Sequence, residues 1–160
     1  MKSLLKPADK KKLEQSAQKE LQAQNMYRYL ANCVQNKGFK GAQSHFLAEA
    51  KDEGKHYQII ADFVNDRGDE LDVLEVPMFD SEAESLKEAF ELAFVAETEL
   101  GEWYNEFYST TSDVVVKIFL QDFVMKQKDA IGEYYDFLAT LEQCGTNEAA
   151  VLLFSESLKK

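Results

Sequence analysis

The sequence predicts an all-α protein: a four-helix bundle with a long connection between its second and third helices and a short fifth helix. Only 2 Pro and 7 Gly occur in 160 residues, which leaves long stretches that favour helix. Apolar residues recur at steps of three and four along four long segments. With 45% hydrophobic residues, we expect a single domain over residues 1–160, with the bundle at about 8–144 and the last helix at about 147–158.

The first two helices are predicted at about residues 7–36 and 42–67. Pro7 suits the first turn of a helix, and the glycine-containing segment Lys37–Gly41 ends one helix before the next begins. Because this turn is short, the two helices are expected to be antiparallel neighbours.

The segment 69–79 is too irregular for a helix and contains Pro77. The second helix, at about 26 residues and ~1.5 Å per residue, is roughly 40 Å long. Eleven or twelve extended residues reach about 36–43 Å. The connection can therefore run the length of the bundle, so that the third helix starts at the far end and lies parallel to the second.

The third helix is predicted to start at Asp80–Ser81, because Ser81 and Glu84 have the spacing of a capping box. A short turn at Ser109–Ser112 then leads to the fourth helix.

The fourth helix begins near Asp113 and ends at Gly145, and Asn147 can cap a final helix to about Leu158. Residues 149–154 of this final helix are apolar on nearly all faces, so we expect the helix to be buried against other chains.

The formal net charge of -11 argues against a nucleic-acid partner, which requires a basic face, and suits attraction of cations. Cys33 and Cys144 fit a reducing compartment. No apolar run approaches about 18 residues, so no membrane span is expected. The N-terminus lacks the apolar core of a signal peptide, and we expect a cytoplasmic protein.

Each long helix carries polar residues within its apolar stripe: Glu20 and Tyr27 on the first, Glu53 and His56 on the second, Glu97 on the third and Gln127 on the fourth. Glu53 and His56 share a helix face, because they are three residues apart. A buried carboxylate is usually neutralised, paired or bound to a metal, so the pair is either an internal ion pair or half of a metal site. Because these polar residues are aligned near the middle of the four helices, they favour one buried site. Its oxygen-rich ligands and single His suit Fe(II) that is oxidised to Fe(III).

These residues resemble those of the non-haem ferritins, and the resemblance covers nearly all of the chain. It lies in the spacings from Glu20 to Tyr27, to Glu53-x-x-His56 and to Glu97. The segment 126–131, with Gln127 and Ala130, resembles the fourth helix of animal heavy-chain ferritins. The segment 151–158 resembles their fifth helix. The resemblance implies a ferritin-like bundle and a homo-oligomeric hollow shell of about 24 subunits.

The resemblance also implies a ferroxidase that oxidises Fe(II) with dioxygen or hydrogen peroxide and stores Fe(III) mineral. Glu20, Glu53 and His56 would hold the first iron of a di-iron centre. Glu53 would bridge to the second iron, held by Glu97.

Further residues follow from the same resemblance. Gln127, at the metal site, would hydrogen-bond an oxygen species or a water rather than act as a strong ligand. Tyr27 would donate a proton or an electron. The fourth helix has Ala130 where bacterioferritins complete a second E-x-x-H, so the second iron should bind more weakly. In bacterioferritins, the Met that binds haem directly follows the glutamate of the second helix. This chain has Gly54 at that position, so no haem is expected.

A competing function is that of a structural storage subunit without oxidase activity, like the light chains of animal ferritins. The complete set of predicted ligands argues against it. A DNA-protecting mini-ferritin is disfavoured because it places its metal between subunits. A rubrerythrin-like peroxidase is disfavoured because it needs a second E-x-x-H.

Other notable side chains are predicted to have structural roles. His45 is expected at a surface or interface. Tyr104 and Tyr134 are expected to pack in the core. Glu49 and Asp122 are interpreted as solvated acids, with iron transit as the alternative.

Overall fold

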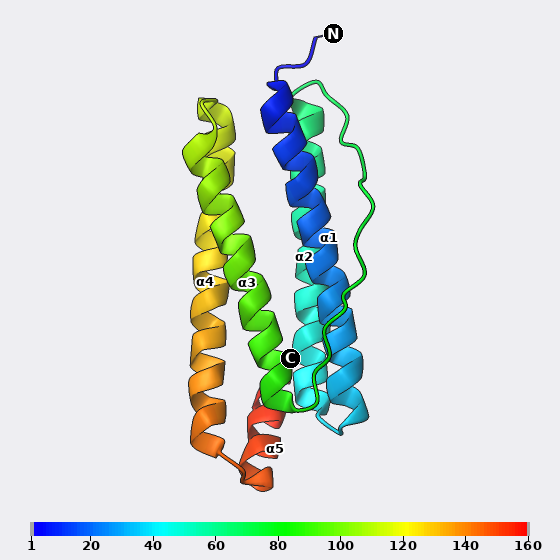
Figure 1. The fold of residues 1–160 in the computed structure, drawn as a ribbon, viewed down its shortest axis with the longest axis vertical. Coiled ribbons are helices and arrows are strands. Elements are labelled where there is room, and N and C mark those ends of the chain that lie inside the picture. Colours follow the sequence, from blue (N-terminus) through cyan, green and yellow to red (C-terminus); the bar gives the residue numbers. More distant parts are fainter. Residues whose placement is uncertain (1, 160) are drawn as a thin grey trace.

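The computed structural model describes residues 2–159, and five helices follow one another within them (Figure 1). Their bounds are α1 Pro7–Asn36, α2 Lys40–Asp66, α3 Leu86–Thr110, α4 Val114–Cys144 and α5 Glu148–Ser157. The helices α1 and α4 run in one direction along the bundle, and α2 and α3 run in the other. The predicted four-helix bundle, with α2 parallel to α3, is therefore confirmed.

The connection between α2 and α3 lies along α1, as Figure 1 shows. An ion pair of 2.9 Å joins Asp69 to Lys10 near the start of α1. The side chain of Gln18 donates to the backbone carbonyl of Glu75 at 2.6 Å. Further along, the backbone N–H of Ala83 donates to the hydroxyl of Tyr29 at 3.3 Å. The connection thus follows α1 for most of its length, which places the start of α3 at the far end of the bundle.

The predicted start of α3 at Asp80–Ser81 is wrong by about one and a half turns. The helix begins at Leu86, and its N-cap is Ser85, whose hydroxyl accepts from the backbone N–H of Glu88 at 3.1 Å. The carboxylate of Glu88 accepts from the backbone N–H of Glu84 at 2.7 Å. The capping pattern of Ser81 and Glu84 is not used, because the chain there is still extended to reach the end of the bundle.

The core consists of two apolar clusters, one towards each end of the bundle. On α1 the first cluster begins at Met26 and the second ends at Ala17, which leaves Glu20 between them. On α2 the gap between Ala50 and Ile60 holds Glu53 and His56.

The same gap interrupts the apolar residues of the other two helices. It holds Glu97 on α3, and Gln127 on α4. A polar belt therefore crosses the bundle at one level, and it is enclosed by apolar residues on both sides.

The short helix α5 closes the end of the bundle by packing against α2 and α4. Its Phe154 is buried, and the hydroxyl of Ser155 accepts from the backbone N–H of Ala42 at 3.0 Å. A Cβ at Gly41 would overlap the backbone carbonyl of Ser155, so this close approach requires glycine. Leu153 on the same helix is 70% exposed, so an apolar face of α5 remains on the outside of the subunit.

None of the helices within residues 2–159 is long and apolar enough to cross a membrane.

Candidate metal centre

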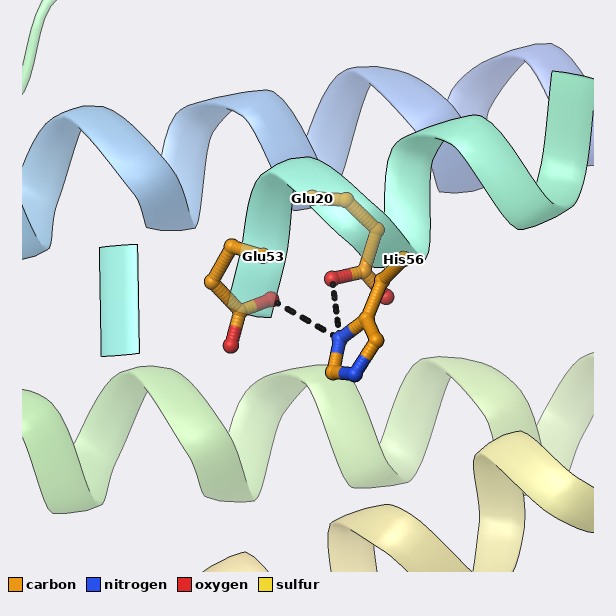
Figure 2. A group of neighbouring side chains, drawn as sticks. All are labelled: Glu20, Glu53 and His56. Carbon is orange, nitrogen blue, oxygen red and sulfur yellow. Dashed lines mark hydrogen bonds and ion pairs between the residues drawn. The ribbon is translucent and has the colours of Figure 1, made fainter. Parts of the chain in front are cut away.

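Glu20 of α1 and the pair Glu53 and His56 of α2 converge within the polar belt (Figure 2). The ring nitrogen Nδ1 of His56 lies 3.3 Å from Oε2 of Glu53 and 3.4 Å from Oε2 of Glu20. Both carboxylates are buried, and the His56 side chain is 18% exposed. The predicted pairing of Glu20 with Glu53-x-x-His56 is therefore present as one compact group of ligand atoms.

Glu53 also belongs to a second group, with Glu49 of the same helix and Glu97 of α3. In each group, one ligand atom per residue lies within 4.8 Å of the ligand atoms of the others. Because Glu53 has two oxygens and belongs to both groups, its carboxylate lies between two adjacent sets of ligands.

Two side chains hold the carboxylate of Glu97 in place. The hydroxyl of Tyr27 donates to its Oε1, and the side-chain amide of Gln127 donates to its Oε2 at 2.6 Å. The same amide donates to the backbone carbonyl of Glu97 at 3.2 Å. The predicted neighbours of the site, Tyr27 and Gln127, thus both act on Glu97.

Tyr104 of α3 also contacts the site, and its hydroxyl donates to Oε1 of Glu20 at 2.5 Å. Its buried ring packs 5.0 Å from that of Phe123, as expected of a core residue. The expected core packing of Tyr104 is therefore confirmed, and its hydroxyl in addition orients a carboxylate of the belt.

The first group of ligand atoms suits a divalent transition metal. Ligands bound to one ion at about 2.1 Å stand roughly 3 to 3.4 Å apart, which matches the separations around His56 Nδ1. Oε2 of Glu20 is buried, and its contact with Nδ1 of His56 is long, at 3.4 Å. A buried carboxylate oxygen that lacks a close hydrogen bond is costly, and a cation bound between this oxygen and the imidazole nitrogen would lower that cost. One imidazole with carboxylates is a donor set that suits iron, manganese or zinc.

Burial raises the pKa of Glu53 well above its ordinary range, and the adjacent Glu20 raises it further. Burial is also the largest influence on Glu20, but hydrogen bonds from Glu53, His56 and Tyr104 outweigh it and lower the pKa of Glu20. For Glu97, burial raises the pKa more than the hydrogen bonds from Tyr27 and Gln127 lower it. The metal-free site therefore favours the protonated form of Glu53, hydrogen-bonded to Glu20, and a bound cation would favour the ionised form.

The site opens to solvent between α2 and α4, through a pocket of about 240 Å³. Acidic residues surround this opening, and Lys126 lies among them; the acids are Glu49, Asp52, Asp129 and Glu133. An approaching cation therefore meets negative charge before it reaches Glu53 and Glu97.

All six site residues predicted from the sequence lie in this centre. Glu49 does too, so its interpretation as a solvated acid is wrong. It stands four residues before Glu53, on the same face of α2, and that spacing was the available signal. Asp122 is exposed, as expected of a solvated acid.

The prediction that His45 lies at a surface or interface is wrong, because only 1% of the residue is exposed in the single subunit. Its Nε2 lies 3.1 Å from the hydroxyl of Tyr134, and aromatic rings surround it. The hydrogen bond to Tyr134 offsets the free-energy cost of burying the imidazole.

Known structures share this fold. An open-pore ferritin from the archaeon Archaeoglobus fulgidus superposes with a TM-score of 0.93 at 22% identity, over 96% of this chain and 97% of that chain. A closed form engineered from the same ferritin gives a TM-score of 0.93 at 23% identity, over 96% of each chain.

Sequence comparison leads to the same group of proteins. A bacterial non-heme ferritin from Staphylococcus saprophyticus is 23% identical over 149 residues, which are 91% of this chain and 89% of that protein. The profile of the ferritin family, described as a ferritin-like domain, matches residues 10–144. Because this match extends over most of the sequence, the chain belongs to the ferritin family.

Proposed function

We propose that this protein is an iron-storage ferritin that oxidises Fe(II) at a di-iron centre within each subunit. Family membership supports the storage role. The observation that carries the oxidase role is the position of Glu53, which belongs to two adjacent groups of ligand atoms. A carboxylate shared between two sites can bridge two metal ions, and two close ions are what a paired oxidation needs.

In this proposal, Glu20, Glu53 and His56 bind the first Fe(II). Glu53 and Glu97 bind the second Fe(II). Glu49 of α2 adds a further carboxylate to this second site, where α4 does not provide one. Two Fe(II) ions together give the two electrons that reduce dioxygen to the level of peroxide. The protons that leave the carboxyl groups when iron binds are available for the reduced oxygen.

The surrounding residues keep the ligands in position. Tyr104 holds one oxygen of Glu20, which leaves the other directed at His56. Tyr27 and Gln127 hold Glu97 from two sides. Fe(III) then leaves towards the acidic opening and is stored as mineral inside a shell of about 24 subunits. We place this shell in the cytoplasm.

The test is stopped-flow oxidation of Fe(II) in air, at two Fe(II) per subunit, in the wild type and in Glu97→Ala. The matched control is Glu106→Ala, which removes an exposed acid from the same helix. We expect a fast rise of Fe(III) absorbance in the wild type and in the control, and its loss in Glu97→Ala.

The competing function is a storage subunit without oxidase activity. Equally slow oxidation in all three proteins would establish that function, and the belt would then be a structural polar core. The raised pKa of Glu53 is compatible with such a core, but the long 3.4 Å contact between Oε2 of Glu20 and Nδ1 of His56 favours the metal site.

A further inference from the structure

A second polar group lies within the apolar core, on the side of the belt towards α5. It consists of His45 on α2 and Tyr134 on α4, each only 1% exposed. Nε2 of His45 lies 3.1 Å from the hydroxyl of Tyr134. The imidazole ring is surrounded by phenylalanine rings, with centroid distances of 5.2 Å to Phe137, 5.4 Å to Phe46 and 5.9 Å to Phe90.

Packing alone does not explain this pair. Phenylalanine and leucine would fill the same space without a buried hydroxyl and imidazole, and each buried polar group costs free energy unless it is hydrogen-bonded. Neither His45 nor Tyr134 takes part in the iron chemistry proposed above.

The pair is connected to the iron site through Tyr27. Tyr134 and Tyr27 belong to the same cluster of buried side chains, and two phenylalanine rings lie between them. The ring centroids are 5.9 Å apart for Tyr134 and Phe90, 4.9 Å for Phe90 and Phe46, and 6.0 Å for Phe46 and Tyr27. Tyr27 in turn donates to Glu97. A continuous series of buried aromatic rings therefore leads from the His45–Tyr134 pair to Tyr27, which is hydrogen-bonded to Glu97 in the second group of ligands.

A phenol gives up an electron readily only when its proton can move to a base at the same time. A neutral imidazole nitrogen within hydrogen-bond distance is such a base. Burial also keeps the oxidised phenol away from solvent and from reactive side chains.

We propose that Tyr134, with His45 as its proton acceptor, is an electron donor to the iron site through Tyr27, a role that rests on the function proposed above. It acts when a subunit holds a single Fe(II) and meets hydrogen peroxide. Reduction of peroxide to water needs two electrons, and one Fe(II) supplies only one of them.

In the balanced step, Fe(II) and Tyr134 each lose one electron, and hydrogen peroxide gains both. The O–O bond breaks and, with two protons from solvent, two water molecules form. The phenolic proton of Tyr134 moves to Nε2 of His45. The products are Fe(III), a neutral tyrosyl radical and an imidazolium, so that no free hydroxyl radical is released.

The experiment uses the assembled apo protein, loaded without oxygen with one Fe(II) per subunit and mixed with one equivalent of hydrogen peroxide. Samples are frozen within milliseconds and examined by electron paramagnetic resonance. We expect a tyrosyl radical in the wild type and its loss in Tyr134→Phe, which keeps the ring. The matched control is Tyr135→Phe, because Tyr135 is the next residue and is 64% exposed; it should retain the signal.

A second variant, His45→Gln, keeps a polar side chain but removes the base, and it should also lose the radical. Circular dichroism and the size of the assembled shell check that both variants are folded. A wild-type signal that persists unchanged in Tyr134→Phe overturns the inference, as does a wild type without any radical.

Failure of the inference and failure of the proposed function are distinguishable by oxidation in air at two Fe(II) per subunit. If the wild type is fast there and Tyr134→Phe keeps the radical, only the role of Tyr134 is wrong. If the wild type is no faster than Glu97→Ala, the ferroxidase function is wrong, and the electron-donor role with it.

Discussion

Tyr104 donates a 2.5 Å hydrogen bond to Oε1 of Glu20, across the bundle from α3 to α1. This bond leaves Oε2 of Glu20 as the oxygen that faces Nδ1 of His56. The hydroxyl thus decides which oxygen of the carboxylate is available to a metal, and it stabilises the charge of a fully buried group.

Tyr104→Phe should therefore lower both the stability of the protein and its affinity for the first metal ion. A buried hydrogen bond to a charged group contributes about 1.5–3 kcal/mol, and we expect a loss of that size in the free energy of unfolding. Chemical denaturation measures the stability, and anaerobic calorimetry with Fe(II) measures the affinity. Tyr108→Phe is the control, since its hydroxyl accepts only a 3.5 Å contact from Gln121 at the surface. An unchanged affinity in Tyr104→Phe would contradict the positioning role.

Glu49→Gln should weaken binding of the second Fe(II) and leave the first nearly unchanged, because Glu49 groups with Glu53 and Glu97 only. Removal of a residue that supports a metal typically costs about 10-fold or more in affinity. Titration with Fe(II) under argon, followed by the rate of oxidation in air, separates the two binding events. Asp52→Asn is the matched control on the same helix, since Asp52 pairs at the surface with Lys55. Equal effects of the two substitutions would mean that Glu49 acts only through the charge of the opening.

The polar belt was predictable from the sequence for a geometric reason. Helical periodicity decides which residues of a helix face inward, and the short turns and the long connection decide the level at which the helices meet. Glu20, Glu53, Glu97 and Gln127 each interrupt an apolar stripe, so their alignment at one level followed from the lengths of the helices.

The hydrogen bonds of Tyr104 and His45 were not predictable in the same way. Both residues occupy stripe positions that any aromatic side chain could fill, and their partners lie on other helices. Such contacts depend on the rotation of each helix about its axis and on side-chain rotamers, which periodicity does not specify. The helix α3 begins at Leu86 rather than at the local capping pattern of Ser81 and Glu84, because the connection stays extended until it reaches the end of the bundle.

The raised pKa of Glu53 predicts a pH dependence of stability for the metal-free protein. The pKa of Glu53 lies above 4.5 in the folded state, because burial disfavours its charge. The folded state therefore binds more protons than the unfolded state above pH 4.5, and stability falls as the pH rises through the folded pKa. The pKa of Glu20 is lowered in the folded state, so its ionised form stabilises the fold at higher pH. This contribution to stability is lost only as the pH falls below 4.5.

Thermal unfolding of the apo protein between about pH 5 and pH 8 measures this effect. Glu53→Gln should remove much of the slope, whereas Glu106→Gln, at the surface of α3, should keep it. Metal binding should release protons in the wild type, which a pH-stat measures directly. A wild-type stability that rises over this range would contradict a protonated Glu53.

Two helical glycines should respond in opposite ways to alanine. Gly132, on the exposed part of α4, has no atom within 4 Å of an added Cβ, so Gly132→Ala should stabilise the protein by about 0.5–1 kcal/mol through helix propensity. At Gly41 an added Cβ would overlap the carbonyl of Ser155, and Gly41→Ala should cost about 1–3 kcal/mol as an overpacked contact. Because this contact seats α5 on the end of the bundle, Gly41→Ala should also expose α5 to limited proteolysis, while Gly132→Ala should not. Equal stabilisation by both substitutions would show that α5 does not pack on α2 as closely as the backbone of Ser155 requires.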